Sequence, residues 1–328
     1  MMSAKEDTSN TMMCCASCGK AECDGTQLRT CTACKSVRYC GVTCQRNHRP
    51  KHKKACKKRA AELRDEILFK QPESTHYGDC PICLLPIPVN PDKSGSLSCC
   101  STRACKGCIM AYINRERNQR LNHTCPFCRD AIDPSGGKQK MMKRVQANDP
   151  IAMYNLFIEL VNEGKFMEGL HLLSKAAELG DADAHYYLSA LYRDGGEGDG
   201  RPYNLGVNVM NRDVLGVERD EKKQVYHLEE ATIGGHAIAR YDLGVYEWNN
   251  GRNDRAVKHW IIASNLGCDK SMGALKECYK DGLVSKEDFA SALRAHHAAV
   301  DATKSPQRDA AEPFIKIQRE MLINRDYT

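Results

Sequence analysis

The chain has 328 residues, a formal net charge of +6 and 41% hydrophobic residues, with aromatic residues at only 6%. This length suits two or three domains. No apolar run approaches the roughly 20 residues of a membrane-spanning helix, so we expect no membrane protein. Of the 19 cysteines, 17 lie before residue 129. A cysteine-rich front half is therefore followed by a different back half.

The N-terminus is polar. Its first residues, MMSAKEDTSN, lack the apolar core of a secretory signal peptide, so we expect none here. We expect residues 1–14 to be disordered. Cysteines in C-x2-C pairs on an intracellular chain favour zinc over disulfides. The expected compartment is a reducing one, the cytosol or the nucleus.

Eight potential metal ligands follow in residues 15–56. Zinc is held by four thiolate or imidazole groups, and two intervening residues let both sulfurs of a pair reach one ion. The ligands form four pairs: Cys15-x2-Cys18, Cys31-x2-Cys34, Cys40-x3-Cys44 and His52-x3-Cys56. This spacing predicts two tetrahedral zinc sites.

The order of these ligands resembles the MYND zinc finger, and Gln45 also fits that family. The resemblance implies two interleaved sites, with Cys15, Cys18, Cys40 and Cys44 on one ion and Cys31, Cys34, His52 and Cys56 on the other. Arg49 stands where MYND fingers often carry an aromatic residue that helps to grip proline-containing peptides. Cys14 and Cys23 fall outside the spacing and are interpreted as spare thiols, with Cys14 as an alternative to Cys15.

A basic run, RNHRPKHKKACKKR, occupies residues 46–59. Such a run can bind nucleic acid or direct nuclear import. No aromatic residues interleave for base stacking, so we favour a solvated helix face beside a zinc site. Residues 55–70 have apolar residues at helical spacing, and Pro72 ends this helix. Residues 57–78 are therefore interpreted as a helix and a linker.

A second cysteine cluster occupies residues 79–130 and resembles a RING finger, a cross-braced domain with two zinc ions. The resemblance implies Cys80, Cys83, Cys105 and Cys108 on the first ion, and Cys100, Cys125 and Cys128 on the second. The usual histidine of the second site falls at Thr102. Cys99 and His123 are the alternative fourth donors, and the remaining alternative is a degenerate, weakly held site.

The resemblance to RING fingers also implies a role in ubiquitin transfer. These domains hold a ubiquitin-charged conjugating enzyme in a reactive pose, which is catalysis by positioning. Three residues match the family contacts: Ile82 beside the first zinc pair, Pro126 in the last pair and Arg129 directly after the final cysteine. Each alone can be a core or surface residue, but together they favour ligase activity. A short helix over residues 109–120 is expected to pack on the zinc core.

Residues 131–148 have turn residues and then a basic patch, and are interpreted as a linker. Asp149 and Pro150 open a helix, as N-cap and first-turn residue. A repeat then begins, with the copies Ala152-Met-Tyr-Asn-Leu156, Ala184-His-Tyr-Tyr-Leu188, Ala239-Arg-Tyr-Asp-Leu243 and the weaker Ser271-Met-Gly-Ala-Leu275. Glycines that can close helices recur before and between them, at Gly164, Gly180, Gly235, Gly251 and Gly267. The pattern predicts stacked pairs of short antiparallel helices over residues 149–303.

These units resemble Sel-one-like repeats, which are relatives of the tetratricopeptide repeat. The resemblance implies a solenoid that binds proteins on a concave face, with small residues at close helix contacts. The histidines of this half are interpreted as ordinary surface or packing residues, namely His236, His259, His296 and His297. Residues 196–215 are interpreted as an inserted loop, because the second and third copies are 55 residues apart. Residues 304–328 are predicted to form a C-terminal helix.

The sequence thus predicts a multidomain fold, in which two small cross-braced zinc-binding domains precede an all-α helical-repeat solenoid. One function is a RING-type ubiquitin ligase or ligase adaptor, with substrate recruited by the repeats and the MYND finger. The alternative is a non-enzymatic interaction scaffold or transcriptional co-regulator whose zinc is purely structural. The expected cofactor is zinc, two ions in the MYND finger and one or two in the RING-like domain. The expected partners are proteins, among them a ubiquitin-conjugating enzyme, and neither nucleic acid nor a membrane.

Overall fold

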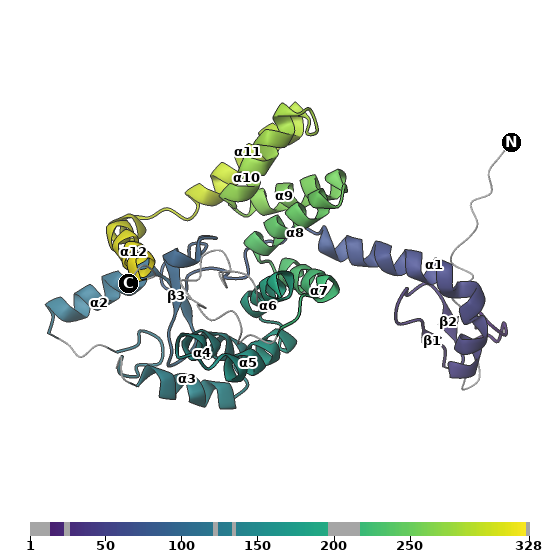
Figure 1. Ribbon diagram of the computed structural model, residues 1–328, viewed down its shortest axis with the longest axis horizontal. Helices are drawn as coiled ribbons and strands as arrows, with labels where there is room; N and C mark the ends of the chain where they lie inside the picture. Colours follow the sequence, from purple (N-terminus) through teal and green to yellow (C-terminus); the bar gives the residue numbers. More distant parts are fainter. Residues whose placement is uncertain (1–13, 23–26, 121–123, 133–135, 196–216, 326–328) are drawn as a thin grey trace. The chain divides into compact units, whose positions relative to one another are not determined.

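The computed structural model describes residues 14–22, 27–120, 124–132, 136–195 and 217–325 (Figure 1). The expected disorder of residues 1–13, the spare thiol Cys23, His123 and the inserted loop at 196–215 lie outside these ranges. The chain divides into two compact units, Met1–Lys70 and Gln71–Thr328. Among the described residues, no helix is both long and apolar enough to cross a membrane.

The N-terminal unit consists of one short hairpin and one long helix. Strands β1 (Arg29–Thr30) and β2 (Arg38–Tyr39) pair antiparallel, and helix α1 spans Val42–Leu68. The helix predicted from residue 55 thus begins 13 residues earlier, inside the first cysteine cluster. Apolar spacing could not reveal this start, because the inward face of the first turns carries Cys44, His52 and Cys56 rather than hydrophobic residues.

The C-terminal unit opens with the second cysteine module, defined here as residues 79–130. A 3-10 turn, η2 (Pro91–Lys93), leads into β3 (Ser94–Ser96), which pairs antiparallel with β4 (Arg103–Cys105). Helix α2 (Lys106–Asn118) follows directly. The predicted helix between the zinc pairs is present, and its Ile109 packs on a cluster formed by Cys80, Cys105 and Cys108.

The segment interpreted as a linker contains a helix, α3 (Gly137–Gln146). Met141 is buried on this helix, and Val145, one turn later, packs against the core of the first repeats. None of the basic residues of this helix is buried. The sequence interpretation needs correction here, because two apolar residues one turn apart are enough to hold a short helix against a preformed surface.

In the part of residues 149–303 that the structure describes, eight helices form the repeats. Three antiparallel pairs have extensive mutual contacts, α4 with α5, α6 with α7 and α8 with α9, and each pair stacks on the next (Figure 1). Their bounds are α4 (Pro150–Asn162), α5 (Phe166–Glu178), α6 (Ala182–Asp194), α7 (Glu221–Ile233), α8 (Ala237–Asn249), α9 (Asn253–Asn265), α10 (Asp269–Lys280) and α11 (Lys286–Asp301). The predicted helical-repeat fold is confirmed.

The repeated small and apolar residues explain this stacking. Ala152, Ala184 and Ala239 are fully buried, as their place at close helix contacts requires. The five predicted glycines all have positive φ and end their helices in the left-handed conformation. Asp149 caps α4 by accepting the amides of Ile151 and Ala152. Each local signal agrees with the stacked arrangement, and this agreement is what makes such repeats recognisable from sequence.

The last helix, α12 (Pro306–Arg325), does not continue the stack. It lies against α2 of the second cysteine module, in yellow beside blue in Figure 1. The C-terminal helix predicted at residues 304–328 is therefore present. It returns the end of the chain to a zinc-ligand segment more than 180 residues earlier.

Candidate metal centres

The structure gathers the cysteine ligands into four groups. The two groups of the N-terminal unit are Cys15, Cys18, Cys40 and Cys44, and Cys31, Cys34, His52 and Cys56. The two groups of the second module are Cys80, Cys83, Cys105 and Cys108, and Cys99, Cys100, Cys125 and Cys128. In each unit the two groups alternate along the sequence. Both pairs of sites are therefore cross-braced.

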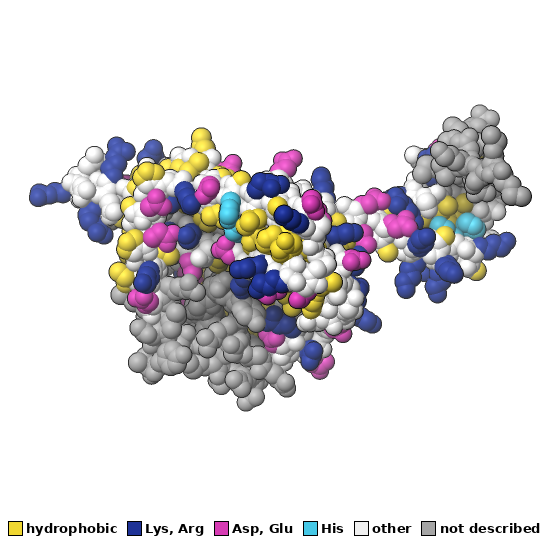
Figure 2. Space-filling model, turned by 90° about the horizontal axis from the view of Figure 1, so that it is seen from above, with side chains coloured by type: hydrophobic (Ala, Val, Ile, Leu, Met, Phe, Trp, Pro, Cys, Tyr) yellow, Lys and Arg dark blue, Asp and Glu magenta, His cyan; other side chains and the backbone are white. Residues whose placement is uncertain are grey.

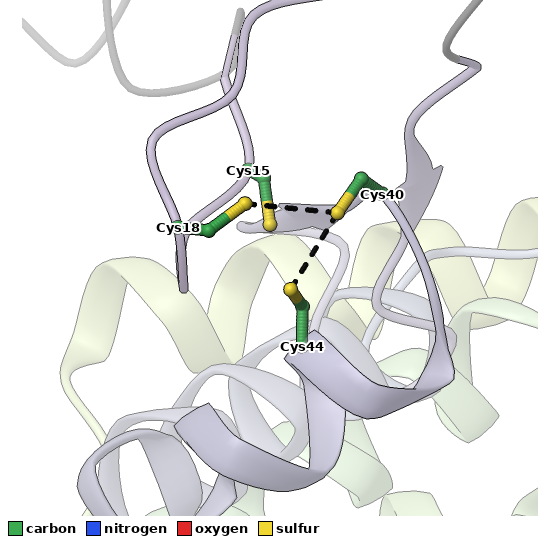
Figure 3. Close-up of side chains that lie close together, drawn as sticks. All are labelled: Cys15, Cys18, Cys40 and Cys44. Carbon is green, nitrogen blue, oxygen red and sulfur yellow. Dashed lines mark hydrogen bonds between the residues drawn. The ribbon is translucent and has the colours of Figure 1, made fainter.

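The spacing of the ligand atoms fits zinc. A tetrahedron with Zn–S bonds of about 2.3 Å has S···S edges of about 3.8 Å. The Sγ–Sγ distances match this edge at 3.7 Å for Cys18–Cys40, 3.8 Å for Cys31–Cys56 and 3.7 Å for Cys100–Cys125. Figure 3 shows the first group, in which four thiols from two loops and the start of α1 turn toward one centre.

Four C-x2-C turns share one backbone geometry. In each turn the amide of the residue after the second cysteine donates to the carbonyl of the first cysteine, at 2.8–3.0 Å. That residue has φ between 57° and 71° at Gly19, Lys35, Leu84 and Arg129. Three of the four are not glycine, so these turns keep a left-handed residue at a cost of about 1–2 kcal/mol each. The turn brings both sulfurs of a pair to the same side.

Thiol acidity differs within each group. Burial would raise the pKa of Cys15, but the backbone amides of Cys40, Cys18 and Ser17 donate to its sulfur and lower this pKa to about 6. Hydrogen bonds also outweigh burial at Cys34, whose pKa falls to about 6, and at Cys80, whose pKa falls to about 7. A neighbouring thiol in each group has a raised pKa, for example Cys56 at about 11. In these three groups the more acidic thiol suits the first step of metal binding, which releases the protons of the remaining thiols.

The only histidine in these groups is His52. Its Nε2 lies 3.3 Å from Cys34 Sγ, and its ring stacks on His48 with centroids 5.5 Å apart. Residues of the basic run are exposed on the rest of α1, at Arg46, Arg49, Lys51, Lys53, Lys54, Lys57 and Lys58. Figure 2 shows Lys and Arg side chains gathered over this N-terminal unit. The run therefore faces solvent, while the ligand face is buried.

Cys99 takes the fourth place in the second group of the second module. Its thiol joins Cys100, Cys125 and Cys128 even though Cys99 and Cys100 are neighbours in the chain. Thr102, at the usual histidine position of a RING finger, places its hydroxyl 3.3 Å from Cys100 Sγ. The alternative donor His123 lies outside the described residues. Cys14, the alternative to Cys15, is not in the ligand group.

The three residues matched to conjugating-enzyme contacts differ in exposure. Ile82 is 41% exposed, beside Leu84 at 75%. Arg129 is exposed, and Pro126 is half-buried. Ile82 and Leu84 share one zinc turn, and Pro126 and Arg129 share another. Each turn thus exposes one of the three side chains, Ile82 or Arg129, while Pro126 is partly covered.

A further group of ligand-type residues was missed by sequence reasoning. Ligand atoms of His76, Asp183 and His236 lie within 4.8 Å of one another, so His236, interpreted from the sequence as an ordinary surface or packing residue, is buried beside two other ligand-type residues. His76 Nε2 lies 3.0 Å and His236 Nε2 3.5 Å from Asp183 Oδ1. The three residues are far apart in the chain and belong to no spacing motif, so no sequence signal joins them.

This group is a hydrogen-bond network rather than a metal site. His236 Nδ1 accepts the amide of Ala239 as the cap of α8, so its Nε2 carries the proton and points at the carboxylate. The same carboxylate already accepts from Tyr77 and Arg103. Burial lowers the pKa of His236 to about 4 and keeps this ring neutral. Burial would raise the pKa of Asp183, but the two histidines hold it well below its ordinary value.

Comparison with known proteins identifies one segment. The MYND finger family matches residues 15–56. No curated protein matches the chain. Two solved structures are similar. One is a Sel1 repeat protein from Oxalobacter formigenes, with a TM-score of 0.40 and 21% sequence identity, and the match covers 60% of this chain and 71% of that chain. The other is a protective antigen of uropathogenic Escherichia coli strains with an SLR fold, with a TM-score of 0.39 and 18% sequence identity, and the match covers 51% of this chain and 34% of that chain. Residues 15–56 are therefore a zinc-binding MYND finger at the front of a mostly helical chain.

Proposed function

We propose that the protein is a RING-type ubiquitin ligase or the adaptor of one. In this role the second cysteine module holds a ubiquitin-charged conjugating enzyme, and the MYND finger and the repeats recruit the substrate. The module needs no nucleophile, because it acts by holding two reactants in one geometry. Arg129 would bridge the conjugating enzyme and ubiquitin, a task that suits the several fixed donors of a guanidinium.

The exposed apolar pair Ile82 and Leu84 is the observation that carries the proposal. Large apolar side chains exposed side by side on a rigid metal-held turn favour a protein contact. Their turn is held by Cys80 and Cys83, whose ligand group alternates in sequence with that of Cys99, Cys100, Cys125 and Cys128. This cross-brace would fix Ile82 relative to Pro126 and Arg129, as a docking surface for a folded enzyme requires.

The position of one cavity supports substrate recruitment by the repeats. A cavity of about 750 Å³ lies within the C-terminal unit, lined by residues 86–90 of the module and by residues 265–270 between α9 and α10. Val89 from the module packs on Ala237 and Cys268 at its edge. A protein segment bound in this cavity would lie beside the first zinc group of the module. Such closeness supports substrate recruitment by the repeats.

Discharge of ubiquitin from conjugating enzymes tests the proposal. The zinc-loaded 328-residue chain is mixed with a panel of ubiquitin-charged enzymes, and loss of the thioester is followed with time. We expect acceleration with at least one enzyme, and its loss in Ile82→Ala and Arg129→Ala. Met167→Ala, which shortens an apolar side chain that is 61% exposed on the repeats, is the matched control and should retain full activity.

A non-enzymatic scaffold is the second candidate. The contact between α12 and α2 favours it, because a helix packed on the zinc module limits the surface left for a conjugating enzyme. The same experiment separates the two functions. Absence of acceleration from a folded chain with all its zinc, across the whole panel, would reject the ligase and leave a scaffold in which zinc is purely structural.

A further inference from the structure

The side chain of Arg308, in the first turn of α12, reaches into the first zinc turn of the second module. Its guanidinium donates to the carbonyl of Pro86 at 2.7 Å and to that of Leu85 at 3.1 Å. It also lies 3.4 Å from Cys83 Sγ. Only 8% of Arg308 is exposed. An arginine so far buried is normally committed to specific partners. Here they are a zinc ligand, its supporting turn and the carbonyl of Thr303, which accepts from Arg308 at 2.7 Å.

One of these partners also closes the zinc turn. The carbonyl of Leu85 accepts the amide of Cys80 at 2.9 Å, which is the hydrogen bond that folds the turn back on itself. Arg308 therefore binds the same carbonyl that orients the first ligand of the group. By bridging Leu85, Pro86 and Cys83, its planar fork fixes the turn at three points.

Helix α12 is seated closely enough to hold Arg308 in place. A Cβ added to Gly107, between the ligands Cys105 and Cys108, would meet the backbone of Arg308 at 2.7 Å. Ala311 and Ile315, on the same face of α12 as Arg308, are buried. At the surface, Lys93 pairs with Glu312 at 2.5 Å. The helix is thus packed directly on the ligand-bearing start of α2.

The positive charge of Arg308 compensates part of the negative charge of this zinc site. Four thiolates around one Zn²⁺ leave a net charge of −2, which is costly to bury without donors and a compensating cation. Backbone amides supply part of this, since Cys105 donates to Cys80 Sγ and Cys108 to Cys105 Sγ, each at 3.4 Å. Arg308 adds the positive charge. Groups of this kind, outside the ligand shell, orient ligands and strengthen metal binding.

We propose that Arg308 is a positioning residue for the zinc held by Cys80, Cys83, Cys105 and Cys108. Helix α12 holds Arg308 against this site. The end of the chain thereby controls how firmly the site retains its ion. This inference does not depend on ligase activity. It requires only that zinc occupies the group, and the fit of the sulfur positions supports that requirement.

Zinc release from the 328-residue chain tests the proposal. Wild type and Arg308→Gln, both loaded with zinc, are mixed with excess chromophoric chelator, and the thiols freed over time are alkylated and mapped by mass spectrometry. We expect the four cysteines of this group to be freed about 10- to 100-fold faster in the variant. The other three groups should release zinc at the wild-type rate. Arg308→Lys, which keeps the charge and loses the fork, should lie between wild type and Arg308→Gln.

Lys316→Gln is the matched control, because Lys316 is an exposed cation on the same helix. Its release pattern should equal that of wild type. Gly107→Ala provides an independent variant, since the added methyl displaces α12 while Arg308 itself is unchanged. It should accelerate release from the same four cysteines. If both Gly107→Ala and Arg308→Gln release this ion at the wild-type rate, the proposal is wrong. If Arg308→Gln loses its helical circular dichroism signal and so does not fold, Gly107→Ala alone is the test. Faster release from the four cysteines then supports the proposal, and release at the wild-type rate contradicts it.

Discussion

The guanidinium of Arg103 lies 3.2 Å from Asp183 Oδ2 and so joins β4 of the second cysteine module to the first turn of α6 in the repeats. The other oxygen of Asp183 accepts from His76 at 3.0 Å and from Tyr77 at 3.3 Å. The Arg103 guanidinium also stacks over the Tyr77 ring at 4.1 Å. One buried carboxylate therefore connects three segments that are far apart in the chain.

Replacing this carboxylate should weaken the whole C-terminal unit. Asp183→Asn keeps the size of the side chain but leaves Arg103 buried without a counter-charge, which costs about 3–5 kcal/mol. Urea unfolding followed by the helical circular dichroism signal should therefore show a much lower midpoint. Asp301→Asn removes a carboxylate that pairs with Lys304 where both side chains are 65% exposed, so its unfolding midpoint should stay close to that of wild type. Equal midpoints for the two variants would contradict the role given to Asp183.

His236 should make the stability of this unit depend on pH. Its pKa is about 4 in the fold against an ordinary 6.5, mainly because it is buried. Between these values the unfolded chain binds a proton that the folded chain does not, so stability is fully present above pH 6.5 and falls as the pH falls toward 4. His76, Asp183 and Tyr186 are the groups that face this ring.

His236→Asn removes the titration and keeps a side chain suited to cap α8. The stability difference between wild type and this variant should shrink by about 1 kcal/mol between pH 7.5 and 5.5. Urea titrations of zinc-loaded protein at both pH values measure it, and zinc loss on acidification cancels because both proteins carry the same sites. A difference that stays constant over this range would show that His236 is not held neutral by the fold.

The first finger should lose its fold without affecting the repeats. Cys34→Ser removes a buried ligand from the group that includes His52. Because the finger lies in its own compact unit, the unfolding midpoint of the C-terminal unit should remain that of wild type. Native mass spectrometry should count fewer bound ions than the four expected for the intact chain. Cys14→Ser, outside every ligand group, should still bind four, and a joint loss of helical signal in Cys34→Ser would contradict the independence of the two units.

The sequence predicts well what is local and periodic. Ligand spacing predicted two zinc sites in residues 15–56, and the resemblance to RING fingers implied seven ligands of the second module, with Cys99 as one alternative for the eighth; the structure gathers these sixteen residues into four groups. The repeated alanines and left-handed glycines predicted the helix pairs. Contacts between segments far apart in the chain have no such signal. The pairing of Arg308 with Cys83 across 225 residues depends on how α12 packs on the module. The pairing of Asp183 with His76 across 107 residues depends on how the segment before the module packs on α6. Helix α3 was not predicted for a related reason. Its apolar residues Met141 and Val145 hold it only by packing against residues elsewhere in the chain, and no local pattern shows this.

The left-handed residue that follows four of the C-x2-C pairs should limit the stability of its zinc turn. Lys35 has φ 58°, a conformation that costs a side-chain-bearing residue about 1–2 kcal/mol and glycine very little. Lys35 is also exposed, so its side chain contributes little packing. Lys35→Gly should raise the free energy of unfolding of the zinc-loaded finger by up to about 1 kcal/mol, because the relief of backbone strain exceeds the extra conformational entropy that glycine gives the unfolded chain. Lys53→Gly, at an exposed site inside α1, should instead lower it by about 1 kcal/mol.

The fourth ligand of the last zinc group can be moved. Cys99→Ser leaves only Cys100, Cys125 and Cys128, so we expect this chain to retain three ions in the presence of a competing chelator where wild type retains four. The Thr102 hydroxyl lies 3.3 Å from Cys100 Sγ, so the side chain at this position already faces the group. Adding Thr102→His to Cys99→Ser should therefore supply an imidazole and restore the fourth ion. Retention of four ions by Cys99→Ser alone would show that another donor completes the site, and failure of the double variant would show that residue 102 is too far from the metal.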